Sequence, residues 1–343
     1  MNPKNVLPEY PRPIMERQDW KNLNGSWNYA ITKKGEPAPN NYQGEILVPF
    51  AVESSLSGVG KTINEHQELW YQRTFDVPSA WKGKQILLHF GAVDYQAEVF
   101  IDGQFIGRHI GGSSSFCMDL TRFAKAGNTH NLIVYVKDEQ RSGLQTIGKQ
   151  CNNFYSGGCS YTRVTGIWQT VWLEAVAPAG LKTAVIRPDI DQQQFVIEPE
   201  FYNESDGTLE VTLLDGQKTI GRKSVKCANS STVILPVKKP KLWTPETPHL
   251  YDIIYRIKDT QGHLIDEVKS YAGMRKVHTA NGLFYLNNEP YYQRLVLDQG
   301  YYPEGIWTAP TDEALKHDIE LGKESGFNGA RIHQKIFEER YYY

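Results

Sequence analysis

The sequence predicts a mainly β protein in which two successive sandwiches are followed by a short α/β segment. Short runs of β-branched and aromatic residues, several of them alternating with polar residues, recur up to residue 273 without helical periods between them. Asp-Gly pairs that suit two-residue hairpins stand among these runs. Beyond residue 273 the pattern changes to strand, helix, strand, which is the unit of a parallel sheet or barrel.

Residues 1–178 are predicted to form a jelly roll. Short strands at this spacing are typical of a sandwich or jelly roll. Asp102-Gly103 lies between two of the strands, and glycine accepts the positive φ of a tight hairpin. The predicted strands are WYQRTFDV (70–77), QILLHFG (85–91), QAEVFI (96–101), NLIVYVK (131–137) and WQTVWLEAV (168–176).

Residues 179–273 are predicted to form an immunoglobulin-like sandwich, because about 95 residues with several alternating strands suit that fold. Asp215-Gly216 marks a further hairpin. Four prolines punctuate one connection, which should be extended and irregular because proline cannot donate to a ladder. The strands are FVIEPEF, TLEVTLL, STVILPV, LYDIIYRIK and LIDEVKSYA, and the prolines are Pro236, Pro240, Pro245 and Pro248.

Residues 274–343 are predicted to begin a (β/α)8 barrel. PYYQRLVLDQ (290–299) indicates a buried strand, and FNGARIH (327–333) indicates the next one. Between them Thr311 can cap a helix that Gly326 ends. A complete barrel needs about 250 residues, and 70 follow Gly273 here. We therefore expect an incomplete barrel, whose exposed apolar side chains (Leu295, Leu297, Phe327 and Ile332) dock on the immunoglobulin-like sandwich or drive self-association.

Composition excludes several classes of protein. The formal net charge is −2, so no basic excess favours nucleic acid. No apolar run approaches the roughly 20 residues of a membrane span. The first residues lack the apolar core of a signal peptide, which makes a cytoplasmic location the default expectation, or a periplasmic or secreted one if a leader has been lost. The 20 Tyr and 8 Trp suit sugar stacking and β-rich cores alike.

The cysteines predict neither a metal site nor a cofactor. The four have no C-x-x-C pair and no histidine at zinc spacing. Cys151 and Cys159 flank the loop NNFYSGG and could pair in an oxidising compartment. Four reduced thiols within β structure is the preferred interpretation.

A series of stretches along the whole chain carries a family resemblance through its order and spacing, although each stretch alone is weak. They are LNGSW (23–27), VPFAVESSLSGVG (48–60), LWYQRTFDVP (69–78), HFGAVDYQAEVFIDGQFIGRHIGGSSSFCMDLT (89–121), TGIWQTVWLEAV (165–176), KLWTPETPHLYDI (241–253), YAGMRKV (271–277), FYLNNEPYYQRLVLDQGYYPEG (284–305) and GFNGARIHQK (326–335). Together they resemble glycoside hydrolase family 2, which includes the β-galactosidases, β-glucuronidases and β-mannosidases.

The resemblance implies a sugar-binding-like jelly roll, an immunoglobulin-like sandwich and a catalytic barrel that cleaves a β-glycoside with retention. One glutamate protonates the leaving oxygen while a second attacks the anomeric carbon, with the two carboxyl groups about 5–5.5 Å apart. In the family both lie on later barrel strands, beyond residue 343. The acids Asp298, Glu304, Glu338 and Glu339 do not match those motifs. We therefore assign no catalytic residue and expect this chain alone to be inactive.

The resemblance also implies where substrate contacts lie. Substrates of barrel enzymes meet the C-terminal ends of the strands, where Asp298 and Gln299 end the first strand and Arg331 and His333 end the second. In the family an arginine and a histidine there contact the sugar or support the catalytic carboxylates, and arginine can form charge-assisted pairs. The alternative is a structural ion pair for Arg331 and simple burial for His333.

One departure from the family leaves the sugar open. Some β-galactosidases and β-glucuronidases carry an aspartate six residues before the glycine of a Gly-Ile-aromatic motif, here Gly166-Ile167-Trp168, and the matching residue is Ser160. A hydroxyl cannot replace a carboxylate in bidentate recognition of sugar hydroxyls. The aromatic loop around Tyr155 and Tyr161 either shapes the subsite or packs beneath the loop.

Two other classes of function compete with the glycosidase. A stand-alone carbohydrate-binding or adhesion protein would use the jelly roll as a lectin, but it has no use for strands of a barrel. An interaction protein would complete its barrel with another polypeptide.

Overall fold

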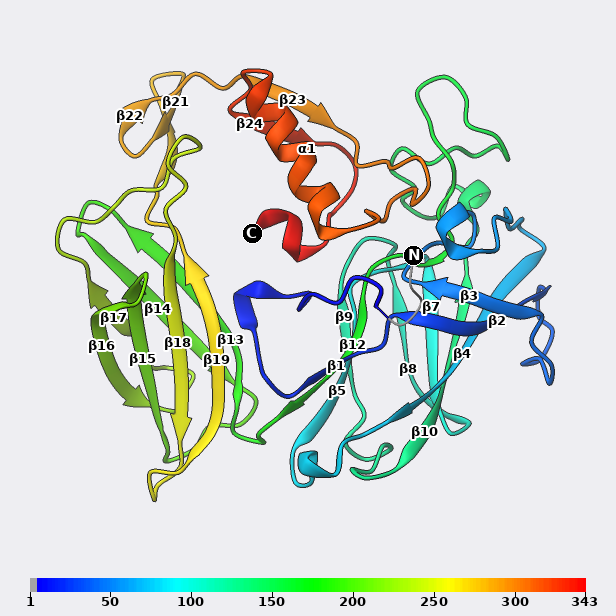
Figure 1. Cartoon of the computed structure of the whole chain (residues 1–343), viewed down its shortest axis with the longest axis horizontal. Coiled ribbons are helices and arrows are strands. Elements are labelled where there is room, and N and C mark those ends of the chain that lie inside the picture. The colour runs from blue at the N-terminus through cyan, green and yellow to red at the C-terminus, as the bar shows by residue number, and fades with distance from the viewer. Residues whose placement is uncertain (1–4) are drawn as a thin grey trace.

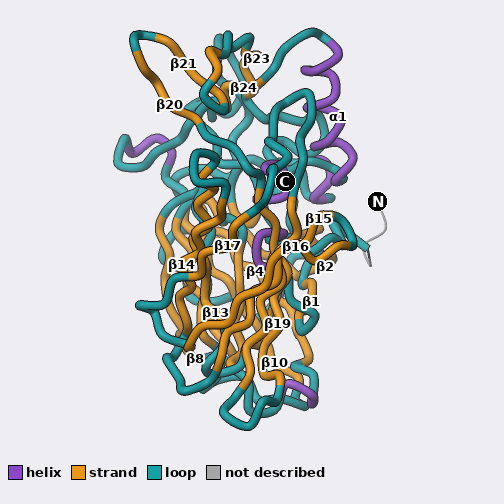
Figure 2. Tube along the Cα trace, turned by 90° about the vertical axis from the view of Figure 1, so that its left-hand side faces the viewer, coloured by secondary structure: helices purple, strands orange, loops and turns teal. Residues whose placement is uncertain are grey.

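The computed structural model describes residues 5–343, in which strands dominate and the α-helix is α1 (Asp312–Glu324). Figure 1 shows two β-sandwiches side by side, with the orange and red C-terminal segment above them. The quarter-turn view in Figure 2 places the strands of both sandwiches below and the helix α1 above. No helix in the described part is long and apolar enough to span a membrane.

The first sandwich is the predicted jelly roll, and its two main sheets enclose a core that includes Trp27, Tyr71 and Phe90. One sheet has the order β3-β2-β4-β10-β7-β8, formed by Gly44–Val48, Gly25–Lys33, Gln67–Asp76, Thr129–Lys137, Gln96–Ile101 and Gln104–Ile110. The other has the order β1-β12-β5-β9, formed by Trp20–Asn22, Val171–Val176, Gln85–Phe90 and Phe116–Asp119. A small pair joins β11 (Gly166–Ile167) to β6 (Val93–Asp94).

The local signals of this domain are confirmed. Asp102 and Gly103 have φ of 49° and 80°, as expected of the hairpin between β7 and β8. Short 3-10 helices complete the connections of the chain at Pro13–Met15, Ser55–Ser57, Ser79–Trp81, Gln140–Ser142 and Glu339–Tyr342. All four cysteines are free thiols, in agreement with the preferred interpretation, but its placement within β structure holds for Cys117 on β9 and not for Cys151, Cys159 and Cys227, which lie outside the strands.

The second sandwich is immunoglobulin-like and has a separate core around Phe195, Tyr251 and Tyr255. Its sheets have the orders β13-β14-β17 (Leu181–Asp189, Gln194–Phe201, Val233–Pro236) and β16-β15-β18-β19 (Lys218–Lys226, Thr208–Asp215, Tyr251–Lys258, Leu264–Ala272). Gly216, at φ 60°, turns the hairpin between β15 and β16. No strand interrupts the connection from β17 to β18 that contains Pro240, Pro245 and Pro248, as predicted, whereas Pro236 belongs to the end of β17.

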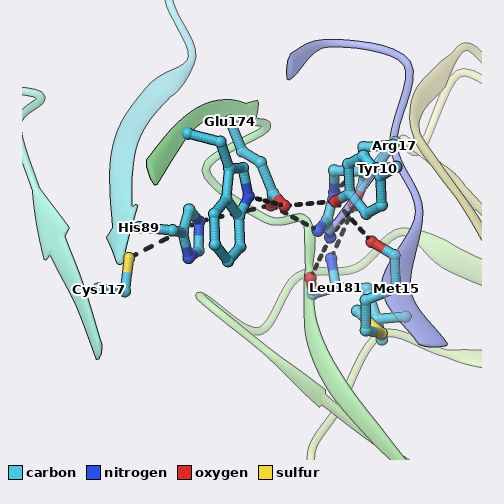
Figure 3. A network of polar contacts seen from close by, with 9 residues as sticks. Tyr10, Met15, Arg17, His89, Cys117, Glu174 and Leu181 are labelled. Atoms are coloured by element: carbon cyan, nitrogen blue, oxygen red, sulfur yellow. Dashed lines mark hydrogen bonds and ion pairs between the residues drawn. The ribbon is translucent and has the colours of Figure 1, made fainter. Parts of the chain in front are cut away.

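A buried polar network joins the two sandwiches through the N-terminal segment (Figure 3). The Arg17 guanidinium lies 3.4 Å from a carboxylate oxygen of Glu174 on β12 and 3.2 Å from one of Asp266 on β19. Arg17 also donates to the carbonyl of Leu181, and the Tyr10 hydroxyl contacts Glu174. One arginine thus neutralises a buried carboxylate from each sandwich.

The C-terminal segment contains the predicted strand–helix–strand unit. β23 (Leu295–Asp298) and β24 (Gly329–Ile332) pair in parallel, and α1 lies between them in sequence. The Thr311 hydroxyl caps α1 by accepting a hydrogen bond from the Ala314 N–H at 3.2 Å, and Gly326 follows the helix at φ 87°. A small antiparallel sheet precedes this unit, with β20 (Val277–Ala280), β21 (Leu283–Leu286) and β22 (Glu289–Pro290).

Two expectations for this segment are corrected. The predicted buried strand at 290–299 is shorter, and its Leu295 and Leu297 are 42% and 48% exposed because β24 is its sole neighbour among the described strands. The segment contacts both sandwiches: the loop after β23 packs on the jelly roll through Trp307 against Trp168, at 5.0 Å between ring centroids, whereas Lys276 pairs with Asp191 of the immunoglobulin-like sandwich at 2.6 Å. Phe327 is exposed, whereas Ile332 is half-buried against the cluster beneath α1.

Candidate substrate-binding site

The four predicted contact residues lie together at the C-terminal ends of β23 and β24. The register pairs Leu297 with Arg331, and the His333 N–H donates to the Asp298 carbonyl at 2.9 Å. Gln299 continues directly from β23. The fold therefore brings these residues to one edge, and their role toward a substrate stays a prediction.

The Asp298 carboxylate is used within the protein. One oxygen accepts the Gly300 N–H at 2.8 Å, and the other accepts the Tyr341 hydroxyl at 2.7 Å. Burial and the hydrogen bond to this carboxylate raise the pKa of Tyr341 well above its usual range. Asp298 therefore fixes the end of β23 to the last residues of the chain.

Arg331 and His333 lie on the opposite face of β24 from Ile332, because successive strand residues alternate. Ile332 packs toward α1, so Arg331 and His333 face away from the helix. Arg331 is exposed and has no ion pair with any of residues 5–343, whereas His333 is half-buried. Neither the structural ion pair nor the full burial of the alternative interpretation is seen.

Lys335 is a residue that sequence reasoning missed. Its buried ammonium donates to the carbonyls of Gly300 at 2.7 Å and Trp307 at 2.6 Å, and lies 4.2 Å from the centroid of the Phe337 ring. Burial lowers the pKa of Lys335 to about 8. These contacts connect the loop after β23 to the segment after β24. They could not be predicted, because a lysine that follows a predicted strand does not by itself indicate a buried ammonium group.

The jelly roll borders the same edge. The Tyr161 ring packs on Tyr301, three residues after β23, with 4.6 Å between centroids. Gly148 lies so close to the carbonyl of Gln334 that a Cβ would collide with it. Ser160, at the position for which the family resemblance implies an aspartate, closes a turn with Gly157 through paired backbone hydrogen bonds of 3.1 and 3.2 Å.

Three carboxylates near Thr165 and Gln150 were also missed: Glu53 and Asp94 are buried, and Asp138 is half-buried. Glu53 accepts the Thr165 N–H at 2.9 Å, Asp138 accepts the Thr165 hydroxyl at 2.7 Å, and Asp94 accepts the Gln150 amide at 2.7 Å. Burial raises the pKa of Glu53 to about 8 and also raises the pKa of Asp94 and of Asp138. Residues far apart in sequence meet here, so no local pattern reveals the cluster.

The remaining acids do not form a second site at the strand ends. Glu304 is exposed on the loop after β23. Glu338 and Glu339 line a cavity of about 270 Å³ between the jelly roll and the two chain ends, together with Trp172 and Phe337. Within residues 5–343 no cluster of three or more His, Cys, Asp or Glu side chains is placed to hold a metal ion.

The chemistry of the edge is that of polar recognition. A free guanidinium, an imidazole and an amide can donate to hydroxyl or carboxylate oxygens, and neighbouring aromatic rings can pack on the apolar face of a sugar. The structure thus combines a jelly roll, an immunoglobulin-like sandwich and a parallel strand–helix–strand unit that presents this edge.

Comparison with known proteins identifies the family of the chain. Residues 58–176 match the sugar binding domain of the glycosyl hydrolases family 2, and residues 180–275 match a second domain of the glycosyl hydrolases family 2. The chain belongs to glycoside hydrolase family 2.

The similar proteins are longer than this chain. A β-galactosidase of Thermoanaerobacter pseudethanolicus is 27% identical over 278 residues, covering 76% of this chain and 36% of that protein. A β-glucuronidase of Bacteroides fragilis is 26% identical over 347 residues, covering 92% and 46%. The chain spans about a third to a half of the length of the curated relatives it matches.

The fold is shared with a solved structure. The crystal structure of Ruminococcus gnavus β-glucuronidase superposes with a TM-score of 0.78 at 21% sequence identity, covering 98% of this chain and 58% of that one. At this identity the likeness concerns the fold.

Proposed function

We propose that this chain is the N-terminal, substrate-facing part of a retaining β-glycosidase that cleaves β-glucuronide or β-galactoside bonds. The observation that carries the proposal is the exposed Arg331 side chain, on the same C-terminal edge of two parallel strands as His333 and Gln299. The names of the relatives, β-glucuronidase and β-galactosidase, support the two sugar classes.

The proposal assigns a role to each part of the chain. Residues 1–178 form the jelly roll, 179–273 the immunoglobulin-like sandwich and 274–343 the start of the barrel, a division supported by two separate apolar cores. Arg331, His333 and Gln299 contact the sugar, and Asp298 holds the strand end on which they stand. The exposed Leu295, Leu297 and Phe327 supply the apolar surface for self-association of the chain.

A polypeptide of residues 1–343 is expected to release no 4-nitrophenol from 4-nitrophenyl β-D-glucuronide or β-D-galactoside above the buffer rate. The reaction needs a general acid and a nucleophile about 5–5.5 Å apart, and we assign neither to this chain. Absorbance at pH 7 measures the release. Turnover that Asp298→Asn abolishes would show that the acid at the end of β23 takes part in chemistry.

The proposed sugar contact is tested by Arg331→Ala. Hydrogen bonds to a charged group contribute about 1.5–3 kcal/mol, so we expect the dissociation constant of methyl β-D-glucuronide or galactoside to rise at least about tenfold. NMR titration of the 343-residue chain measures it. Lys316→Ala, an exposed cation on α1, is the matched control and should leave the affinity unchanged. Equal affinity of wild type and Arg331→Ala would refute the proposed site.

A further inference from the structure

An aromatic arm of the jelly roll, residues 150–163, reaches the edge at which β23 and β24 end. Figure 1 shows this green loop rising beside the orange segment that follows β23. Its Tyr161 packs on Tyr301, and the preceding Gly148 lies against Gln334, two residues beyond β24. The arm therefore borders the segments that directly follow β23 and β24, next to the strand ends that carry the proposed sugar contacts.

The base of the arm is held rigidly. The buried Arg163 guanidinium donates to the carbonyls of Ile63 at 3.1 Å, Cys151 at 3.3 Å and Asn152 at 2.6 Å. The Cys151 N–H donates to the Tyr161 carbonyl at 2.7 Å, which closes the two sides of the arm. These bonds fix the direction in which the tip projects.

The tip of the arm carries aromatic rings that are exposed to solvent. Tyr155 is 86% exposed, Phe154 44% and Tyr161 37%, and the ring of Phe154 lies 4.9 Å from the Arg163 guanidinium. The tip sequence FYSGGCSY (154–161) contains no charged residue. An exposed group of aromatic rings without charge suits a neutral ring with an apolar face.

We propose that Tyr155 and Tyr161 form the binding surface for the leaving group of the β-glycoside, a neutral aryl or sugar ring. This inference rests on the proposed function, which places the reacting sugar over Gln299, Arg331 and His333. The leaving group must then extend from the strand ends toward solvent, where the arm stands. Tyr155 and Tyr161 are thus specificity-determining residues that stack on the second ring of the substrate.

The test compares glycosides that share a sugar and differ in the leaving group. Saturation-transfer NMR on the 343-residue chain measures the affinities of 4-nitrophenyl β-D-galactoside, lactose and methyl β-D-galactoside, and of the two corresponding glucuronides. We expect the aryl glycosides and lactose to bind about fivefold more tightly than the methyl glycosides, as one aromatic stacking contact permits. Tyr155→Ala should remove this preference and Tyr155→Trp should keep it.

The matched control is Tyr292→Ala. Tyr292 is 80% exposed but precedes β23, at the opposite end of the strands, so this variant should keep the preference. A preference that survives Tyr155→Ala, or no preference in the wild type, overturns the inference while sugar binding through Arg331 stands. Aryl binding that needs Tyr155 but is unchanged in Arg331→Ala overturns the proposed function and, with it, the assignment to a leaving group.

Discussion

Arg17→Met is expected to lower the free energy of unfolding by about 3–5 kcal/mol, the range for breaking a buried ion pair. The Arg17 side chain is almost fully buried, and both its partners, Glu174 and Asp266, are buried as well. Methionine fills much of the volume but removes the cation that is ion-paired with both buried carboxylates. Because Glu174 belongs to the jelly roll and Asp266 to the immunoglobulin-like sandwich, the variant should also weaken their joint (Figure 3).

Urea denaturation followed by tryptophan fluorescence measures this loss, and calorimetry shows whether the sandwiches then unfold in separate transitions. Lys182→Met is the matched control. Lys182 pairs with Glu200 at 2.6 Å, but both side chains are about half exposed, so the expected change is at most about 1 kcal/mol. A loss for Arg17→Met no larger than that of the control would show that Arg17 does not hold the sandwiches together.

Much of the fold follows from local chemistry and was predictable. Alternating β-branched and aromatic residues define the strands of both sandwiches, and Asp102-Gly103 defines a hairpin through its positive φ. The Thr311 cap and Gly326 bracket α1 within a few residues of the sequence. Each of these signals depends only on residues that are close together in the sequence, so a single sequence is enough to recognise it.

The polar interior was not predictable because its partners are distant in sequence. Arg17 meets Glu174 and Asp266 from 157 and 249 residues away. Lys335 donates to a carbonyl in the loop after β23, a stretch for which the sequence pattern predicts no structure. Glu53 accepts the N–H of Thr165, which is 112 residues away in the sequence. The burial predicted for the first barrel strand failed for a related reason. A run of apolar residues does not say whether neighbouring strands cover it.

The candidate site was predictable in position and only partly in detail. Substrates meet the C-terminal ends of barrel strands, and this rule predicted that Asp298, Gln299, Arg331 and His333 lie at one edge. The parallel pairing of β23 with β24 brings these strand ends together. The hydrogen bond from Tyr341 to Asp298 and the packing of Tyr161 on Tyr301 depend on how separate segments fold together. The sequence pattern contains no information on such contacts.

Glu53→Gln is expected to stabilise the protein increasingly as pH rises. Burial raises the pKa of Glu53 from 4.5 to about 8 in the folded protein. The unfolded chain therefore releases this proton first, and stability is greatest below pH 4.5 and is lost progressively up to about pH 8. At about 1.4 kcal/mol per pH unit, the penalty at pH 7 is on the order of 3 kcal/mol.

Glutamine removes the titration and keeps an oxygen for the Thr165 N–H, which lies 2.9 Å from the present carboxylate. Urea unfolding at pH 5 and pH 8 should show the advantage of the variant growing by about 3–4 kcal/mol between the two values. Asp94 and Asp138 also have a raised pKa and stay in both proteins, and because the Glu53 charge itself contributes to raising the pKa of Asp94, its removal changes stability in the same direction. Glu45→Gln, at an exposed position of β3, is the control and should show no such growth. An equal advantage at both pH values would mean that Glu53 is ionised in the folded protein, and the buried cluster would then need a counter-charge.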